Sequence, residues 1–98
     1  MQQNTPEHHL KKPPSVVTQQ DIATIVSKLF DVPEETVMNA TSIHDIAHQS
    51  LDKIELICAL EDHYHITLNL EDDQYLSNWD RIIPYLQHKV ELTQKNES

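Results

Sequence analysis

Residues 49–66 read QSLDKIELICALEDHYHI, and this stretch decides how the chain folds. Its apolar residues recur at the spacing of an α-helix, in which each residue advances by about 100°. One compact apolar face results, made of Leu56, Ile57, Leu60 and Tyr64. The pattern predicts a helix from about Ser50 to Tyr64 that buries this face in a core.

A second apolar strip lies on the opposite side of the same helix. It consists of Leu51, Ile54 and Cys58, bordered by Glu55, Glu61 and Asp62. Because a helix in a small bundle has only one side to bury, an apolar strip fenced by carboxylates favours a docking surface. The alternative is that the loop before Ser50 covers Leu51 and Ile54. Lys53 falls on the core face, where its stem could lie along the core with the ammonium group in water.

Helical periodicity also marks the segments on either side. After Thr18, which can act as an N-cap, apolar residues follow helical spacing from Ile22 to Phe30. Residues 31–33 then break the pattern at a proline. The remaining expectations are a single helical turn at 33–35, a loop at 38–49, a short helix at 71–76 and a last helix from residue 77 or 78 to Lys89.

Two features bear on the helix ends. Pro84 lies inside the last helix, so we expect a kink there or a helix that begins later than its periodicity. The chain contains no glycine, so residues such as His65 or Asn69 are expected to adopt the left-handed conformation that ends helices. No strand-like alternation appears. The expected fold class is all-α, a small bundle of three main helices and one short helix.

The length of 98 residues suits one domain with one modest core. We expect a flexible N-terminal tail over 1–17, the domain over 18–90 and a C-terminal tail over 91–98. No apolar run is long enough for a membrane span and no secretory signal is visible, so we expect a cytoplasmic protein. The single cysteine, Cys58, excludes an internal disulfide, and a monomer is expected.

The chain is strongly acidic, with sixteen acidic and seven basic side chains and a formal net charge of −9. Such a surface repels the phosphate backbone of nucleic acids and anionic membranes. Residues 45–73 concentrate the effect, because they contain eight carboxylates and one lysine. This local field favours partners with basic surfaces.

Ser50 stands at the start of the predicted helix. A serine there is most often an N-cap, whose hydroxyl accepts a hydrogen bond from an amide of the first turn. The same helix end attracts anions through its free amides and its dipole. A phosphoester on this hydroxyl would therefore be tolerated.

Residues 50–62, SLDKIELICALED, resemble the second helix of acyl carrier proteins, whose Asp-Ser-Leu motif contains the serine that receives 4′-phosphopantetheine. The likeness extends over about residues 18–89. It includes VPEETV at 32–37, NAT at 39–41, and the segments 66–73 and 82–86. The resemblance implies an acyl-carrier-protein-like bundle that is a carrier and not an enzyme.

The family's properties imply specific roles for this chain. A separate phosphopantetheinyl transferase would use Mg²⁺ and coenzyme A to attach the arm to Ser50, and the thiol of the arm would hold acyl groups as thioesters. The residues matching the family's recognition surface for basic patches of acyl-processing enzymes are Gln49, Leu51, Asp52, Ile54, Glu55, Cys58, Glu61 and Asp62. The implied function is a freestanding carrier for discrete fatty acid, polyketide or related acyl biosynthesis enzymes.

The sequence departs from the family at two places. Gln49 replaces the aspartate before the serine, and residues 46–48 lack the usual glycine. The alternative is therefore a carrier-like interaction protein that keeps the fold but is not modified. A peptidyl carrier is a third reading, disfavoured by the acidity of the helix over 50–64.

The residues suggest three other kinds of site, and each lacks a feature that its chemistry needs. His63 and His65 with Glu61 lack the spacing of a structural zinc site, and no metal is expected. His48 near Ser50 lacks the nucleophile elbow of a serine hydrolase. The carboxylates around Cys58 are the opposite of the electropositive surroundings that a catalytic thiol needs.

Overall fold

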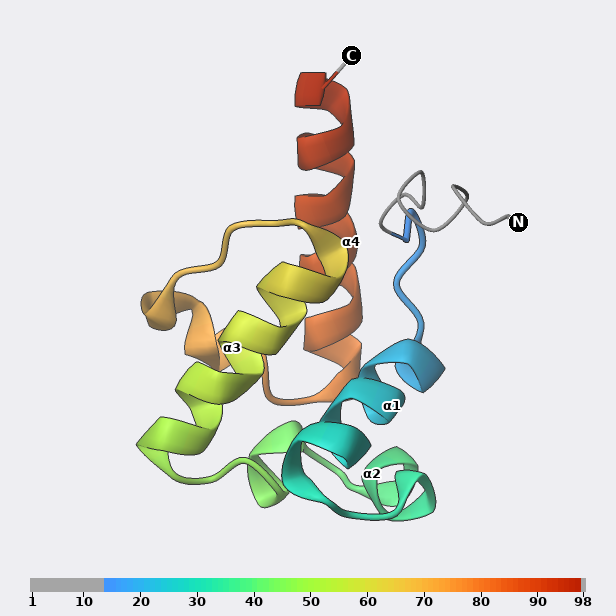
Figure 1. Ribbon diagram of the computed structural model, residues 1–98, viewed down its shortest axis with the longest axis vertical. Coiled ribbons are helices and arrows are strands. Elements are labelled where there is room, and N and C mark those ends of the chain that lie inside the picture. Colours follow the sequence, from blue (N-terminus) through green and yellow to red (C-terminus); the bar gives the residue numbers. More distant parts are fainter. Residues whose placement is uncertain (1–13, 98) are drawn as a thin grey trace, which may run out of the picture.

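The computed structural model describes residues 14–97, with side chains through Thr93, and this part of the chain is an all-α bundle without strands (Figure 1). Its elements are α1 (Gln19–Phe30), α2 (Glu34–Asn39), η2 (Ile43–Asp45), α3 (Ser50–Tyr64), η3 (Leu70–Tyr75) and α4 (Trp79–Glu97), where η denotes a 3₁₀ helix. One isolated bridge pairs Ser42 with Asn78. The predicted fold class is confirmed. No helix among the described residues is both long and apolar enough to cross a bilayer.

The helix α1 begins and ends as its local sequence requires. The Thr18 side chain accepts a hydrogen bond from the Asp21 amide at 3.1 Å, which confirms the predicted N-cap. The helix is followed by its C-cap residue Asp31, which has a left-handed backbone with φ 57°. In a chain without glycine, aspartate is among the residues that adopt this conformation at low cost.

The helix α3 spans the predicted residues and is followed by a left-handed turn at His65. His65 takes the left-handed conformation, with φ 56°, as expected, whereas Asn69 has φ −110° and does not. After this turn the Leu68 amide donates to Oε2 of Glu61 at 2.8 Å. Glu61 therefore ties the segment after α3 back onto the helix.

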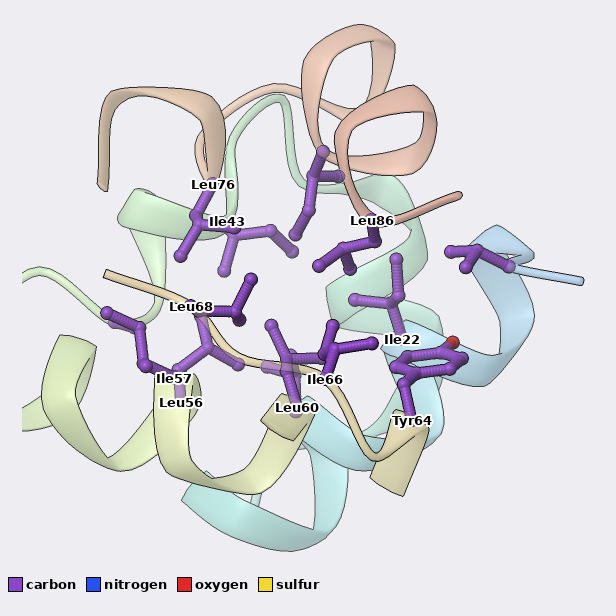
Figure 2. Close-up of a cluster of buried hydrophobic side chains, with 14 of the residues drawn as sticks. Ile22, Ile43, Leu56, Ile57, Leu60, Tyr64, Ile66, Leu68, Leu76 and Leu86 are labelled. Carbon is purple, nitrogen blue, oxygen red and sulfur yellow. The ribbon is translucent and has the colours of Figure 1, made fainter. Parts of the chain in front are cut away.

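The predicted face of α3 lies in the core. Leu56, Ile57, Leu60 and Tyr64 are buried, and in Figure 2 they point toward Ile22 of α1, Ile43 of η2, Leu76 after η3 and Leu86 of α4. Side chains from α1, η2, α4 and the segment after η3 thus meet the buried face of α3. At roughly 25 cal/mol per Å² of apolar surface removed from water, such burial is the main favourable term in the stability of a small domain.

The ordered bundle begins before residue 18, where the sequence placed the end of a flexible tail. Val17 is only 5% exposed, and its amide donates to Oε1 of Gln87 at 2.9 Å. Nε2 of Gln87 donates to the carbonyl of Ser15, also at 2.9 Å. The expectation failed here because the anchor lies about seventy residues away along the chain. The rest of the predicted tail, residues 1–13, falls outside the described part.

The last helix also exceeds its predicted end. It runs from Trp79 through Pro84 to Glu97, so the predicted end at Lys89 was wrong, and residues 91–97 continue the helix. Val90 is buried and supplies one more turn of apolar contact. Beyond it, residues such as glutamine, lysine and glutamate favour helix intrinsically. The helix begins at Trp79, one residue after the later of the two expected starts, and Pro84 lies inside it.

The short elements differ from their predictions in type. The segment expected to form a single turn is the six-residue helix α2, and the expected loop contains the 3₁₀ helix η2. The short helix predicted at 71–76 is the 3₁₀ helix η3 at Leu70–Tyr75. The amide of Ile43 donates to the carbonyl of Ser77 at 2.7 Å. This contact between distant segments could not be read from local periodicity.

Tyr64 yields a stability prediction. Its hydroxyl is buried with no hydrogen-bond partner in the described structure, and an unpaired buried hydroxyl costs about 1–3 kcal/mol. Tyr64→Phe should therefore raise the free energy of unfolding by about 1 kcal/mol, measured by urea denaturation at neutral pH. Tyr85→Phe is the matched control, because it removes a hydrogen bond to Asp72 and should lower stability. Equal losses in both variants would contradict this account.

The same side chain predicts a pH dependence. Burial, together with the nearby Asp21 carboxylate, raises the pKa of Tyr64 from 10 to about 12. The folded state thus favours the neutral phenol. The stability that this raised pKa contributes is fully present below pH 10 and is lost as the pH rises through 12. Between pH 10 and 12 the stability of Tyr64→Phe should fall less steeply than that of the wild type.

Glu61 yields a second prediction. Removing its carboxylate leaves the Leu68 amide without its acceptor, so Glu61→Ala should lower the free energy of unfolding by about 1–2 kcal/mol. Asp62→Ala, at the exposed neighbouring position, should change stability by less than about 0.5 kcal/mol. Urea denaturation of both variants measures the difference. Indistinguishable midpoints would show that the contact with Leu68 does not stabilise the turn.

Candidate functional site

Ser50 is the first residue of α3 and its side chain is exposed. The N-cap position is occupied by Gln49, whose side chain makes no capping hydrogen bond. The expectation that Ser50 is the N-cap is therefore wrong by one position. Within residues 14–97 the Ser50 hydroxyl has no hydrogen-bond partner, so it stands free at the edge of the bundle among the unpaired amides of a helix start.

A pocket of about 200 Å³ opens beside this hydroxyl. It lies between α3 and η3, and its lining consists of Ser50, Lys53, Ile54, Leu70 and Asp73. Two of these side chains are apolar and two carry opposite charges. The serine therefore borders a small cavity with an apolar wall and an ion pair.

The ion pair belongs to a three-residue cluster that joins three elements. Nζ of Lys53 in α3 lies 3.5 Å from Oδ2 of Asp73 in η3, and Nε2 of His44 in η2 lies 3.1 Å from Oδ1 of the same carboxylate. Lys53 and Asp73 are 29% and 28% exposed. This arrangement explains the position of Lys53 on the helix, because its ammonium group faces η3 at the margin of the core.

The second apolar strip of α3 is open to solvent. Leu51 is 65% exposed and Ile54 is 41% exposed, while Cys58 is also exposed. The alternative in which the preceding loop covers these side chains is wrong. Beside the strip, Glu55 and Asp62 are exposed. An apolar strip with a carboxylate border is therefore available on the surface.

The other predicted recognition residues have mixed placements. Gln49 is exposed at the helix start, and Asp52 is half-buried. Glu61 is also half-buried and its carboxylate accepts a hydrogen bond from the backbone beyond the helix. The structure thus gives Glu61 an intramolecular contact that the helical projection could not reveal.

Sequence reasoning missed the part of the site contributed by η3. Leu70 and Asp73 border the serine, yet they appeared in the sequence only as members of an acidic segment. Tyr85 of α4 donates to Asp72 and stacks on Tyr75 with ring centroids 5.2 Å apart. Burial and the Asp72 carboxylate raise the pKa of Tyr85. These contacts hold η3 against the bundle, and only the tertiary structure reveals them.

The competing sites gain no support from the geometry. His48 is exposed and, in the described part of the chain, forms no hydrogen bond with Ser50. Across residues 14–97 no group of three or more histidine, cysteine, aspartate and glutamate side chains could hold a metal ion. A larger groove of about 510 Å³ lies between α1 and α3, lined by residues such as Ile25, Leu29 and Asp62, and Ser50 is not among them.

Comparison with known proteins supplies the family. The chain is 33% identical to an acyl carrier protein of Buchnera aphidicola subsp. Schizaphis graminum over 69 residues, which cover 69% of this chain and 87% of the relative. It is 30% identical to an acyl carrier protein of Cyanidioschyzon merolae over 79 residues, covering 79% of this chain and 87% of that relative. No family model and no solved structure matches the chain. Identity at this level over most of both chains, together with the all-α bundle, shows that this chain belongs to the acyl carrier protein family.

Proposed function

We propose that this protein carries acyl intermediates as thioesters on a 4′-phosphopantetheine arm attached to Ser50, in service of discrete fatty acid, polyketide or related acyl biosynthesis enzymes. The observation that carries the proposal is the exposed, unpaired Ser50 hydroxyl in the first turn of α3, beside a pocket of about 200 Å³. The residues present fit such an arm. A free hydroxyl offers the attachment point, and the amides of the helix start favour the negative charge of a phosphodiester.

The chemistry assigned to the chain is limited to one nucleophile. Oγ of Ser50 forms a bond to the phosphorus atom next to pantetheine in coenzyme A, the pyrophosphate bond breaks, and adenosine 3′,5′-bisphosphate leaves. Among the described residues no basic side chain is hydrogen-bonded to this hydroxyl, so its proton passes to a base on a separate, Mg²⁺-dependent phosphopantetheinyl transferase. Once attached, the arm supplies a thiol that holds acyl groups. The protein itself then acts as a carrier and not as an enzyme.

Partner recognition is assigned to the exposed side of α3. The apolar strip of Leu51, Ile54 and Cys58 would meet apolar side chains of a partner, and the exposed carboxylates Glu55 and Asp62 would meet arginine and lysine. Gln49 and Asp52 flank the serine in the same surface. Exposed ion pairs contribute about 0.2–1 kcal/mol each, so these complexes should be short-lived and weakened by salt. A carrier that visits several enzymes as a monomer requires such weak binding.

A second function is favoured by one observation. Gln49 stands where the family has an aspartate, and it brings no charge to a basic transferase. The alternative is a carrier-like interaction protein that keeps the same docking surface without the arm. Whether Ser50 accepts the arm separates the two.

Attachment of the arm is tested by intact mass. Incubation of the full chain with a broad-range transferase, coenzyme A and Mg²⁺ should add the mass of one phosphopantetheine group to the wild type. Ser50→Ala should gain nothing, whereas Ser77→Ala, at a serine outside α3, should be loaded normally. An unchanged wild-type mass, or loading that persists in Ser50→Ala, would overturn the carrier assignment.

The role of Gln49 is tested by the rate of that reaction. If an aspartate at this position contributes about 1 kcal/mol to contact with the transferase, Gln49→Asp should be loaded roughly five times faster than the wild type. The measurement is the initial loading rate at low salt, where exposed charges are least screened. Equal rates would show that this transferase does not read the charge before the serine.

The docking surface is tested by charge reversal. Glu55→Lys and Asp62→Lys should each slow acyl transfer from a partner with a basic patch by roughly two- to fivefold at low salt, with helix content unchanged in circular dichroism. The difference should shrink as salt is added. Glu35→Lys on α2 makes the same charge change elsewhere and serves as the control. An equal slowing in all three variants would indicate an effect of net charge alone.

A further inference from the structure

Lys53 is placed to reach whatever is attached to Ser50. The two residues lie three positions apart on α3, and side chains at this spacing are neighbours on a helix surface, with Cβ atoms about 5–6 Å apart. Both also line the same pocket of about 200 Å³. A group on the Ser50 hydroxyl would therefore emerge beside the ammonium group of Lys53.

The carboxylates around this position make its charge negative, and Lys53 is the exception. It is the one lysine or arginine between Lys28 and Arg81 in the sequence. Asp52 precedes it and Glu55 follows two residues later on α3, and Asp73 borders the pocket. A phosphodiester on Ser50 would add a negative charge to this acidic surface. Lys53 is the cation positioned to offset the resulting repulsion.

The ion pair between Lys53 and Asp73 is a weak one. The distance of 3.5 Å between Nζ of Lys53 and Oδ2 of Asp73 exceeds the 2.7–2.9 Å or so of a strong charge-assisted hydrogen bond. An ammonium group has three donors and a flexible stem, so it can turn to another acceptor within reach. Asp73 would not lose all contacts, because its other oxygen remains 3.1 Å from Nε2 of His44.

We propose that Lys53 positions the phosphopantetheine arm by pairing with the phosphodiester on Ser50, and that it does so in exchange for its ion pair with Asp73. This inference rests on the proposed attachment of the arm to Ser50. It assigns the cluster of Lys53, Asp73 and His44 a role in the loaded protein. Loading with the arm breaks the ion pair between Lys53 of α3 and Asp73 of η3. The contact between Asp73 and His44 of η2 stays in place.

The test is phosphorus NMR on the full chain after loading with phosphopantetheine. The phosphodiester resonance of Lys53→Met should be displaced from that of the wild type, and Lys53→Arg should restore it. Lys28→Met, which removes a lysine of α1 in the groove away from Ser50, should leave the resonance unchanged. Asp73→Asn removes the competing carboxylate, so its resonance should stay with the wild type or move further from that of Lys53→Met.

Backbone amide shifts provide a second readout that an effect on folding alone would not produce. On loading, the amides of η3 should move in the wild type and stay in place in Lys53→Met, whose other amide shifts report that the fold is intact. Identical phosphorus resonances in wild type and Lys53→Met, or an equal displacement in Lys28→Met, would overturn the inference. A normal mass gain with that result would leave the proposed carrier function standing. Absence of any mass gain would remove both proposals.

Discussion

The helix α3 can bury only one of its two apolar faces, and the burial of that face fixes what the surface of the protein presents. Leu56, Leu60 and Tyr64 are buried in one core together with side chains from α1, η2 and α4. A helix of fifteen residues rotates about its axis as a unit, so this packing also sets the orientation of Ser50 and of the exposed strip. Turning α3 to bury the strip would expose the larger side chains, at a cost of about 1.5–3 kcal/mol for each one.

The same constraint separates residues that look alike in the sequence. Glu61 and Asp62 are adjacent carboxylates, yet the 100° step between them turns one toward the following segment and leaves the other in solvent. Lys53 likewise lies at the margin between the core and the surface, where it can meet η3. Charge on this helix therefore has two uses, one internal to the fold and one available to partners.

Prediction from the sequence succeeded where the controlling contacts are local. Periodicity gave the bounds of α3, and the place of Thr18 before the first periodic apolar residue gave the cap of α1. It failed where distant segments decide the outcome, as at Val17, which is held by Gln87. The 3₁₀ character of η3 and the presence of Asp73 in the same pocket as Ser50 also depend on tertiary contacts. The serine and the exposed strip were therefore predictable, whereas the pocket and its ion pair were not.

The two hydrogen bonds that Gln87 makes with residues 15 and 17 fix where the chain enters the bundle. Figure 1 shows the leading segment meeting the bundle beside α4, at the opposite end from the first turn of α3. A surface linker or fluorophore joined at residue 14 would thus start on the side of the bundle away from Ser50. Immobilised at residue 14, the protein would present Ser50 and the exposed strip of α3 away from the support.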